Sequence, residues 1–250
     1  MQRRAPEIEI VADETALAGR LASFVAATAT AALAAHGRCD LALAGGSTPK
    51  AAYGLLAAPP YASRIDWNRV RFFFSDERCV APVDDESNYK SAKTTLLDPL
   101  NISEDAVFRM RGEIRPAEAA REYAAILRRE LEGDADGTPV FDLVMLGMGP
   151  DGHTASLFPG SDPFADDLLL VRAPYVEKLA TYRITLTPRV LNAARHVVVA
   201  TAGPSKADAL AAVLDGPRNP SLYPIAVLEP HDGDVTWLVD AVAVAKRAPR

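Results

Sequence analysis

Short apolar runs rich in β-branched and aromatic residues alternate along the chain with stretches of helical pattern. Strand-like runs occupy residues 8–11, 40–45 and 69–75, each followed by a helical stretch, and a helix over 116–131 precedes the run FDLVMLG at 141–147. Strands that alternate with helices in this way are typical of a parallel sheet with helices packed against it. The pattern therefore predicts a doubly wound, Rossmann-like α/β fold whose mostly parallel sheet is flanked by helices.

Beyond position 160 the alternation is less regular. These irregular runs leave room for a small antiparallel lobe beside the main sheet. Neither a composition shift nor a low-complexity linker divides the chain, so we predict a single domain over residues 1–250. Further strand-like runs are expected at 168–171, 183–187, 196–201, 225–228 and 235–240, with a short helix after the second of them and a helix over 204–214.

Residues 15–35 form an apolar stretch that superficially resembles a membrane span. Arg20, several Ser and Thr residues, and the dominance of alanine over leucine favour instead a packed, alanine-rich helix. The N-terminal sequence MQRRAPEIEIVADE turns acidic before any apolar region forms, which argues against a secretory signal. Cys39 and Cys79 lie far apart and in no C-x-x-C pattern, so we expect a protein of the reducing cytoplasm.

The charge balance narrows the choice of partners. The formal net charge is −6 and the sequence pI is about 5.3. Nucleic acids and anionic membranes are bound by basic surfaces, so neither is an expected partner. To bind an anionic small molecule, this acidic protein would need Lys or Arg side chains clustered in one place. In a parallel sheet, that place is the edge formed by the carboxyl ends of the strands.

The loop AGGSTPKAAY follows the strand at 40–45 and is the first candidate site. Gly45 and Gly46 allow the backbone to approach a ligand, and either Ser47 or Thr48 could cap the helix that follows. Free amides and hydroxyls at a helix N-terminus suit a phosphate, whereas the glycines are too few for a Walker loop. We therefore predict a site for one phosphate here; a capped turn without a ligand is the structural alternative.

The second candidate loop begins where an aromatic strand leads directly into Asp76, Glu77 and Arg78. The guanidinium of Arg78 could bind a phosphate or carboxylate through its fork of donors. Asp76 would then orient substrate hydroxyls or hold Arg78. A charge cluster at the end of a strand can equally be a solvated edge of the sheet, and the stretch alone does not decide between these interpretations.

The third candidate loop, LGMGPDGHTASLFPG at 146–160, contains glycines in the G-x-G-x-x-G spacing of a dinucleotide-binding turn. Pro150 and Asp151 stand where a pyrophosphate would need amide donors, and Pro159 interrupts the following helix within two turns. A dinucleotide site is therefore not expected. The loop instead presents Asp151 and His153 at the end of a strand, and a histidine, which titrates near neutrality, suits general-base catalysis.

These loops contain the motifs of a known family. Taken together and in order, they resemble the 6-phosphogluconolactonases over nearly the whole chain. The sequence departs from the family's pattern at KLATY before Arg183, where prolines are typical. The motifs are GGSTP at 45–49, SDER at 75–78, DESN at 85–88, the long and specific GMGPDGHTASLFPG at 147–160, RITLTP at 183–188 and GPSK at 203–206.

The resemblance implies hydrolysis of 6-phospho-D-glucono-1,5-lactone to 6-phospho-D-gluconate, the second step of the oxidative pentose phosphate pathway. By the same resemblance, His153 removes a proton from the attacking water and Asp151 orients its imidazole. A δ-lactone is already activated toward water, so no covalent nucleophile is required. The residues expected to bind the substrate are Gly45, Gly46, Ser47, Thr48, Asp76, Arg78, Arg183 and Lys206.

The expected partner is thus a small phosphorylated sugar lactone, bound by a monomer or a weak homo-oligomer. The resemblance implies no cofactor and no metal. The sequence also gives no sign of a metal site, because the four histidines are dispersed and show no ligand spacing such as H-x-x-x-H.

Two other functions share part of the pattern. Glucosamine-6-phosphate deaminases have the G-S-T-P loop and the D-G-H core, but their ring-opening glutamate corresponds here to Phe158, which cannot relay a proton. A non-catalytic sugar-phosphate sensor would share the fold, since fold alone does not decide function. Such regulators usually carry a DNA-binding or partner domain, and no basic helix-turn-helix segment is present in this sequence.

Overall fold

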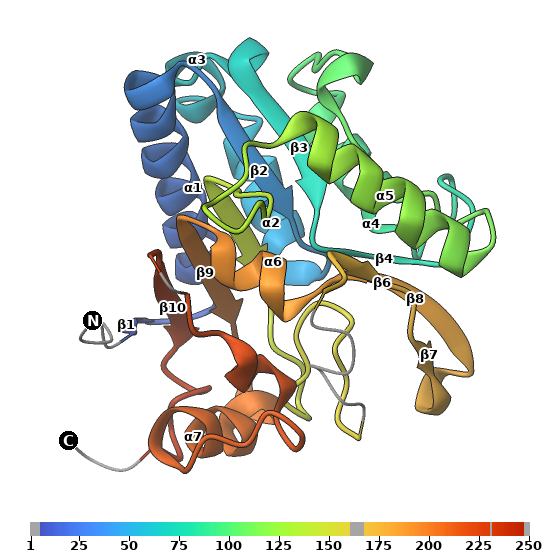
Figure 1. The fold of residues 1–250 in the computed structure, drawn as a ribbon. Coiled ribbons are helices and arrows are strands. Elements are labelled where there is room, and N and C mark those ends of the chain that lie inside the picture. The colour runs from blue at the N-terminus through green and yellow to red at the C-terminus, as the bar shows by residue number, and fades with distance from the viewer. Residues whose placement is uncertain (1–5, 161–167, 231, 248–250) are drawn as a thin grey trace.

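The structure is a computed structural model that describes residues 6–160, 168–230 and 232–247. Its main sheet has six strands, all parallel, in the order β1–β10–β9–β5–β2–β3 (Figure 1). β3 lies beyond β2 on one side, whereas β9 and β10 follow β5 on the other, so the direction of winding reverses between β2 and β5. Ligands bind at such a switch point. The strands are β1 (Glu7–Val11), β2 (Cys39–Leu43), β3 (Val70–Phe74), β5 (Leu143–Leu146), β9 (His196–Thr201) and β10 (Asp234–Asp240).

A second, antiparallel sheet lies beside the carboxyl ends of these strands and extends away from the main sheet (Figure 1). It consists of β4 (Asp76–Arg78), β8 (Thr181–Leu186) and β6 (Val171–Arg172), and β7 (Tyr175–Val176) pairs with the outer part of β8. The predicted fold class, a doubly wound and mostly parallel sheet with a small antiparallel lobe, is thereby confirmed.

Helices cover both faces of the main sheet and form two separate hydrophobic clusters with it. α1 (Glu14–His36), α2 (Ser47–Leu56), α3 (Tyr61–Arg64), α4 (Asn88–Ala92) and the π-helical turn Lys93–Leu97 pack on one face. α5 (Pro116–Glu130), α6 (Pro188–Ala193) and α7 (Ala207–Asp215) pack on the other. The remaining short elements are the 3₁₀ turns Trp67–Arg69, Glu104–Ala106, Glu177–Leu179, Pro204–Lys206 and Pro224–Val227.

The residues of four strands, β2, β3, β5 and β9, alternate between these two clusters, which explains why these strands are mostly apolar. In β3, Phe73 belongs to the cluster under α5, whereas Phe72 and Phe74 belong to the cluster under α1 and α2. A parallel strand with helices on both faces buries every side chain, so its sequence shows a continuous apolar run in place of alternation.

The apolar segment at 15–35 forms α1. Its length and composition would allow it to cross a membrane, and among the described residues no other helix passes that test. In the structure, Leu17, Leu21 and Val25 are buried in the cluster shared with α2 and the sheet, as the predicted packed helix requires. The helix begins after Asp13, whose side chain accepts from the Ala16 amide at 2.8 Å, and ends at Gly37 with φ of 86°.

Three short segments differ from the sequence-based predictions. The apolar run at 225–228 was expected to be a strand, but Pro224–Val227 is a 3₁₀ turn in which Ile225 and Val227 are buried without a strand partner. Only Val171 of the expected strand at 168–171 is in β6, because Leu168 is 80% exposed and turns away from the sheet. β4 was read as a loop, since its three residues are all charged.

Two buried tyrosines hold the strand ends where β2 and β3 separate. The hydroxyl of Tyr53 in α2 accepts from the Ala44 amide at 3.0 Å and donates to the Ala44 carbonyl at 2.7 Å. From the opposite face, the hydroxyl of Tyr123 in α5 bonds the amide and carbonyl of Phe74 at 2.8 and 3.2 Å. The two hydroxyls satisfy buried backbone groups at the ends of β2 and β3, so the strands can end without unpaired buried polar groups.

We expect Tyr53→Phe to lower the free energy of unfolding by about 1–3 kcal/mol, because the Ala44 amide and carbonyl would remain buried without their partner. Urea denaturation of both proteins measures the difference. Tyr175→Phe is the matched control, since Tyr175 is half exposed and surface changes usually stay within about 0.5 kcal/mol. Equal losses in the two variants would show that the Tyr53 hydroxyl does not hold the strand end.

The amino-terminal edge of the sheet carries a different cluster of charges. Arg71 Nε donates to the buried Asp40 carboxylate at 2.6 Å, and the Asp40 amide donates to Asp142 Oδ2 at 2.8 Å. His36, at the end of α1, lies 2.9 Å from the other oxygen of Asp142. These contacts join β2, β3, α1 and the start of β5 at the edge opposite the candidate site.

Candidate functional site

The carboxyl end of β2 leads into the first candidate loop. Gly46, with φ of 108°, is the N-cap of α2, and no side chain caps this helix. The expected capping by Ser47 or Thr48 is therefore wrong: Ser47 is already the first helical residue, and a left-handed glycine makes the turn. As a result, the first amides of the ten-residue helix and the exposed Ser47 have no capping partner and can bind an anion.

The residue before Gly46 must also be a glycine, for a separate, steric reason. A Cβ atom on Gly45 would lie 1.9 Å from Oδ1 of Asn88, which is buried at the start of α4. Asn88 in turn donates to the Asp76 side chain at 3.1 Å and to the Asp76 carbonyl at 2.9 Å. Gly45 therefore allows the β2 loop and the segment after β3 to pack directly on one another.

Asp76 lies in this packed region and is only 8% exposed. Its second carboxylate oxygen accepts from Ser156 Oγ at 2.7 Å, which ties the β3 loop to the loop that follows β5. One of the two roles that the sequence predicts for Asp76 is to hold Arg78, but no ion pair between them is found among the described residues. The observed contacts are those of a residue that joins two loops of the site; whether Asp76 also touches the substrate stays a prediction.

Glu77 is more deeply buried, at 2% exposure. It accepts from the amides of Arg78, Asn88 and Tyr89, each at 2.8 Å, and from Ser87 Oγ at 3.1 Å. Burial raises the pKa of Glu77, and the hydrogen bonds from these amides act in the opposite direction. The acceptor positions of this carboxylate are filled by the 87–89 turn, so its role is to fix that turn.

Two arginines meet at the junction of the sheets. Arg78 of β4 and Arg183 of β8 are register partners in an antiparallel pair, and directly opposed side chains lie on the same face. Burial and the positive charge of Arg78 lower the pKa of Arg183, while the carboxylates of Asp76 and Glu86 oppose this shift. Arg78 also donates to the Glu86 carbonyl. Two guanidinium groups held together in this way favour an anion between them.

The loop after β5 is a tight turn, and no helix begins within residues 147–160. The Gly149 amide donates to the His153 carbonyl at 2.8 Å, and the Gly152 amide donates to the Gly149 carbonyl at 3.0 Å. A Cβ atom on Gly149 would lie 2.0 Å from the His153 ring, and Gly152 has φ of 74°. Both glycines are needed for this turn.

The turn brings the side chains of Asp151 and His153 together. His153 Nδ1 lies 2.5 Å from Asp151 Oδ1, and the His153 ring packs on Phe158 with centroids 4.4 Å apart. Lys178, from the turn between β7 and β8, donates to the other carboxylate oxygen. Partial burial works against ionisation of Asp151, but hydrogen bonds from Lys178 and His153 hold its pKa well below the ordinary value.

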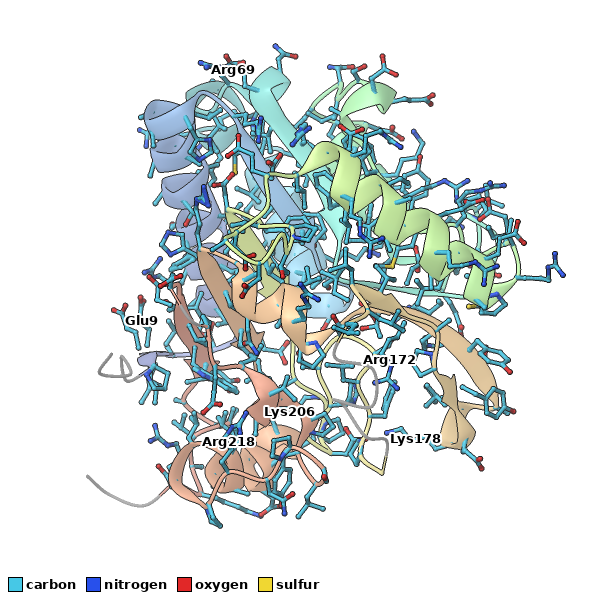
Figure 2. All side chains as sticks on the ribbon, in the orientation of Figure 1. Glu9, Arg69, Arg172, Lys178, Lys206 and Arg218 are labelled. Carbon is cyan, nitrogen blue, oxygen red and sulfur yellow. The ribbon has the colours of Figure 1, made fainter. Side chains whose placement is uncertain are left out.

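Lys206 approaches the same carboxylate from the other side. It ends the 3₁₀ turn Pro204–Lys206, which leads into α7, so the predicted helix over 204–214 begins as a tighter turn. Burial lowers the pKa of Lys206, and the negative charge of Asp151 opposes this shift. In Figure 2, Lys178 and Lys206 lie on opposite sides of the loop that carries Asp151.

Six of the predicted residues form two groups at the carboxyl edge of β2, β3 and β5, and the other four, Gly45, Gly46, Ser47 and Thr48, lie at the start of α2. Arg78, Arg183 and Asp76 make up one group, and Asp151, His153 and Lys206 make up the other; the hydrogen bond from Ser156 to Asp76 connects them. Asn88, Ser156 and Lys178 were not predicted. Asn88 and Ser156 lie in the motifs DESN and GMGPDGHTASLFPG, and Lys178 lies in the unusual stretch before Arg183; these were the only sequence signals for the three residues.

The described residues contain no group of three or more His, Cys, Asp or Glu side chains arranged to hold a metal ion. A histidine backed by a carboxylate can accept and return a proton, and the surrounding cations and helix amides can hold an anionic substrate.

Comparisons with known proteins identify the family of the chain. Residues 12–237 match the family described as glucosamine-6-phosphate isomerases/6-phosphogluconolactonase. The 6-phosphogluconolactonase of Homo sapiens is 39% identical over 241 residues, which cover 94% of this chain and 92% of the relative. That of Treponema pallidum is 40% identical over 178 residues, which cover 71% of this chain and 73% of the relative.

A solved structure, that of 6-phosphogluconolactonase from Trypanosoma brucei, superposes with a TM-score of 0.87 at 28% sequence identity and covers 99% of this chain and 100% of its own. The match to the family extends over most of the chain, including every residue of the two groups described above. The chain belongs to the family of glucosamine-6-phosphate isomerases and 6-phosphogluconolactonases.

Proposed function

We propose that the protein is a cytoplasmic hydrolase that converts 6-phospho-D-glucono-1,5-lactone to 6-phospho-D-gluconate, with His153 as general base. The observation that carries this proposal is the short contact of His153 with Asp151 at the switch point, beside a cluster of cations. The relatives named above, which span most of the chain, are 6-phosphogluconolactonases, and this supports the substrate.

In this proposal the contact with Asp151 selects the tautomer of the neutral imidazole. Asp151 Oδ1 is a hydrogen-bond acceptor 2.5 Å from Nδ1, so the neutral ring carries its proton on Nδ1 and its lone pair on Nε2. No described residue hydrogen-bonds Nε2. This nitrogen takes a proton from water while the water oxygen bonds to the lactone carbonyl carbon. The bond from that carbon to the ring oxygen then breaks, and the imidazolium returns the proton to this oxygen.

The phosphate would be bound away from the reacting carbon. The uncapped N-terminus of α2 offers its amides together with the hydroxyls of Ser47 and Thr48, and the paired Arg78 and Arg183 supply charge. Lys206 stands between the phosphate and the Asp151 carboxylate in this proposal. These three cations make the phosphate site locally positive, although the whole protein has a net charge of −6.

Generating the lactone in situ and following 6-phosphogluconate above the spontaneous background tests this function. Acceleration that is proportional to enzyme concentration is expected. The absence of any acceleration at micromolar enzyme would overturn the proposal.

Deaminase chemistry is disfavoured by one contact. The ring of Phe158 packs against His153 at 4.4 Å, so an apolar surface occupies the position from which the deaminase glutamate would act. A phenyl ring can neither donate nor accept the proton that sugar ring opening requires. The same contact is compatible with lactone hydrolysis, in which a single base suffices.

We expect chelation to leave the activity unchanged. In the proposed reaction the imidazole, and not a metal ion, activates water, and the histidines His36, His153, His196 and His231 are dispersed along the sequence. Assays before and after dialysis against EDTA provide the measurement. If EDTA abolished the activity and zinc or manganese restored it, the water would be activated by a metal ion.

A further inference from the structure

Lys178 lies at the tip of a hairpin that is built independently of the Asp151 loop. β7 and β8 pair at Tyr175–Tyr182 and Val176–Thr181, and the two tyrosine rings pack edge to face with centroids 5.0 Å apart. Ala180, in the left-handed region with φ of 48°, closes the turn through its amide, which donates to the Glu177 carbonyl at 3.0 Å. The position of Lys178 is therefore set by the hairpin.

From this tip, Lys178 makes two contacts with the proposed catalytic loop. Its ammonium group donates to Asp151 Oδ2 and also lies 4.5 Å from the centroid of the Phe158 ring. Asp151 Oδ1 holds His153 Nδ1, and Phe158 packs against the face of the same imidazole. Lys178, Asp151, His153 and Phe158 thus form a closed ring of contacts.

This ring gives each carboxylate oxygen of Asp151 its own cationic or polar donor. With Oδ2 held by Lys178, the carboxylate cannot rotate to offer both oxygens to His153, and the imidazole is fixed from its edge and from its face. We propose that Lys178 is a positioning residue that acts through Asp151 to hold His153 in the orientation and protonation state of a general base. The inference rests on the role proposed above for His153.

The charges around His153 determine the direction of the expected effect. The titratable groups that face the pair are Asp151 itself, Lys178 from the hairpin, Lys206 from the turn before α7, and the Tyr223 phenol, whose ring packs against Gly152. Removal of the Lys178 cation leaves more of the Asp151 negative charge to stabilise a protonated imidazole. The base then becomes available only at higher pH, and activity is lost at the acid side first.

Lys178→Met keeps the apolar stem of the side chain and removes its charge. In this variant the acid limb of the plot of kcat against pH should move to a higher pH by about 0.5–1 unit, which corresponds to a charge interaction of about 1 kcal/mol. KM should change by less than about twofold, because the lysine acts on the base and not on the substrate. Lys178→Arg, which keeps a cation within reach of Asp151, should restore the wild-type profile.

The matched control is Lys93→Met, which removes the lysine of another exposed ion pair, that with Asp98, and should leave the profile unchanged. NMR titration of His153 without substrate gives a second readout, in which Lys178→Met should shift the midpoint in the same direction. This readout does not depend on lactone turnover, so its outcome separates this inference from the proposed function.

An unchanged acid limb and an unchanged His153 titration in Lys178→Met would overturn the inference. So would a rise in KM with the pH profile intact, because Lys178 would then contact the substrate. Neither result would contradict lactone hydrolysis. If the wild-type protein had no lactonase activity but the titration still shifted, the positioning contact would stand and the proposed function would fail.

Discussion

Replacing His153 by glutamine is expected to lower kcat by about 10²- to 10⁴-fold, the usual contribution of a general base, while KM changes little. Glutamine fills similar space and can hydrogen-bond a water, but it cannot accept a proton at neutral pH. The ring, whose side chain is 28% exposed, makes few contacts that stability would require beyond those with Asp151 and Phe158. Steady-state kinetics with lactone generated in situ, together with a thermal melt, provide the measurement.

His196 offers a matched control for this experiment. Its Nδ1 lies 2.9 Å from Asp234 Oδ1, so it forms the same kind of histidine–aspartate pair, but at the amino-terminal end of β9 and away from the site. His196→Gln should keep wild-type kcat. If His153→Gln melts normally and retains more than about a tenth of wild-type kcat, a loss below the usual range for a general base, then His153 has only a structural role.

Arg183→Ala should raise KM for the phosphorylated lactone by about 10- to 100-fold, because a hydrogen bond to a charged group contributes about 1.5–3 kcal/mol. The reason lies in the pairing of Arg183 with Arg78 across β4 and β8, which prepares two guanidinium groups for one anion. kcat should fall far less than in His153→Gln. Initial rates over a range of lactone concentrations separate the two parameters.

Two comparisons make this expectation specific to the phosphate. Arg129→Ala removes a surface arginine whose partner is the neighbouring Glu130, and it should behave as wild type. Unphosphorylated gluconolactone should be a much poorer substrate, and Arg183→Ala should not weaken its use further. Equal kcat/KM of the wild-type protein for both lactones would contradict a phosphate-binding role for this cluster.

The sequence predicted the main sheet well because its strands are buried on both faces. In β2, β5 and β9, both hydrophobic clusters take side chains from the same strand, so the apolar signal is continuous and hard to mistake. The same signal misled at 225–228, where buried apolar residues form a 3₁₀ turn that starts at Pro224. Apolar character reports burial, and burial does not require a strand.

The candidate site was predictable where it depends on local chemistry. Glycines, a histidine and charged residues directly after β2, β3 and β5 marked the three loops, and the parallel topology places these loops at one edge. The contacts between the loops were not predictable. Ser156 and Asp76 are 80 positions apart, and Lys178 and Asp151 are 27 positions apart on different sheets. Such contacts depend on how whole helices and strands pack together, and a local sequence pattern does not predict this packing.

The charged cluster of Asp40, Asp142, Arg71 and His36 lies at the opposite end of the same strands. β2 has five residues, so that edge is about 16 Å from the proposed catalytic edge. Free-energy effects at that separation usually add without interaction. Substitutions that raise thermal stability at the amino-terminal edge should therefore leave the substrate range, which is set at the carboxyl edge, unchanged. Stabilising variants selected at one edge and substrate-range variants selected at the other can then be combined in one protein.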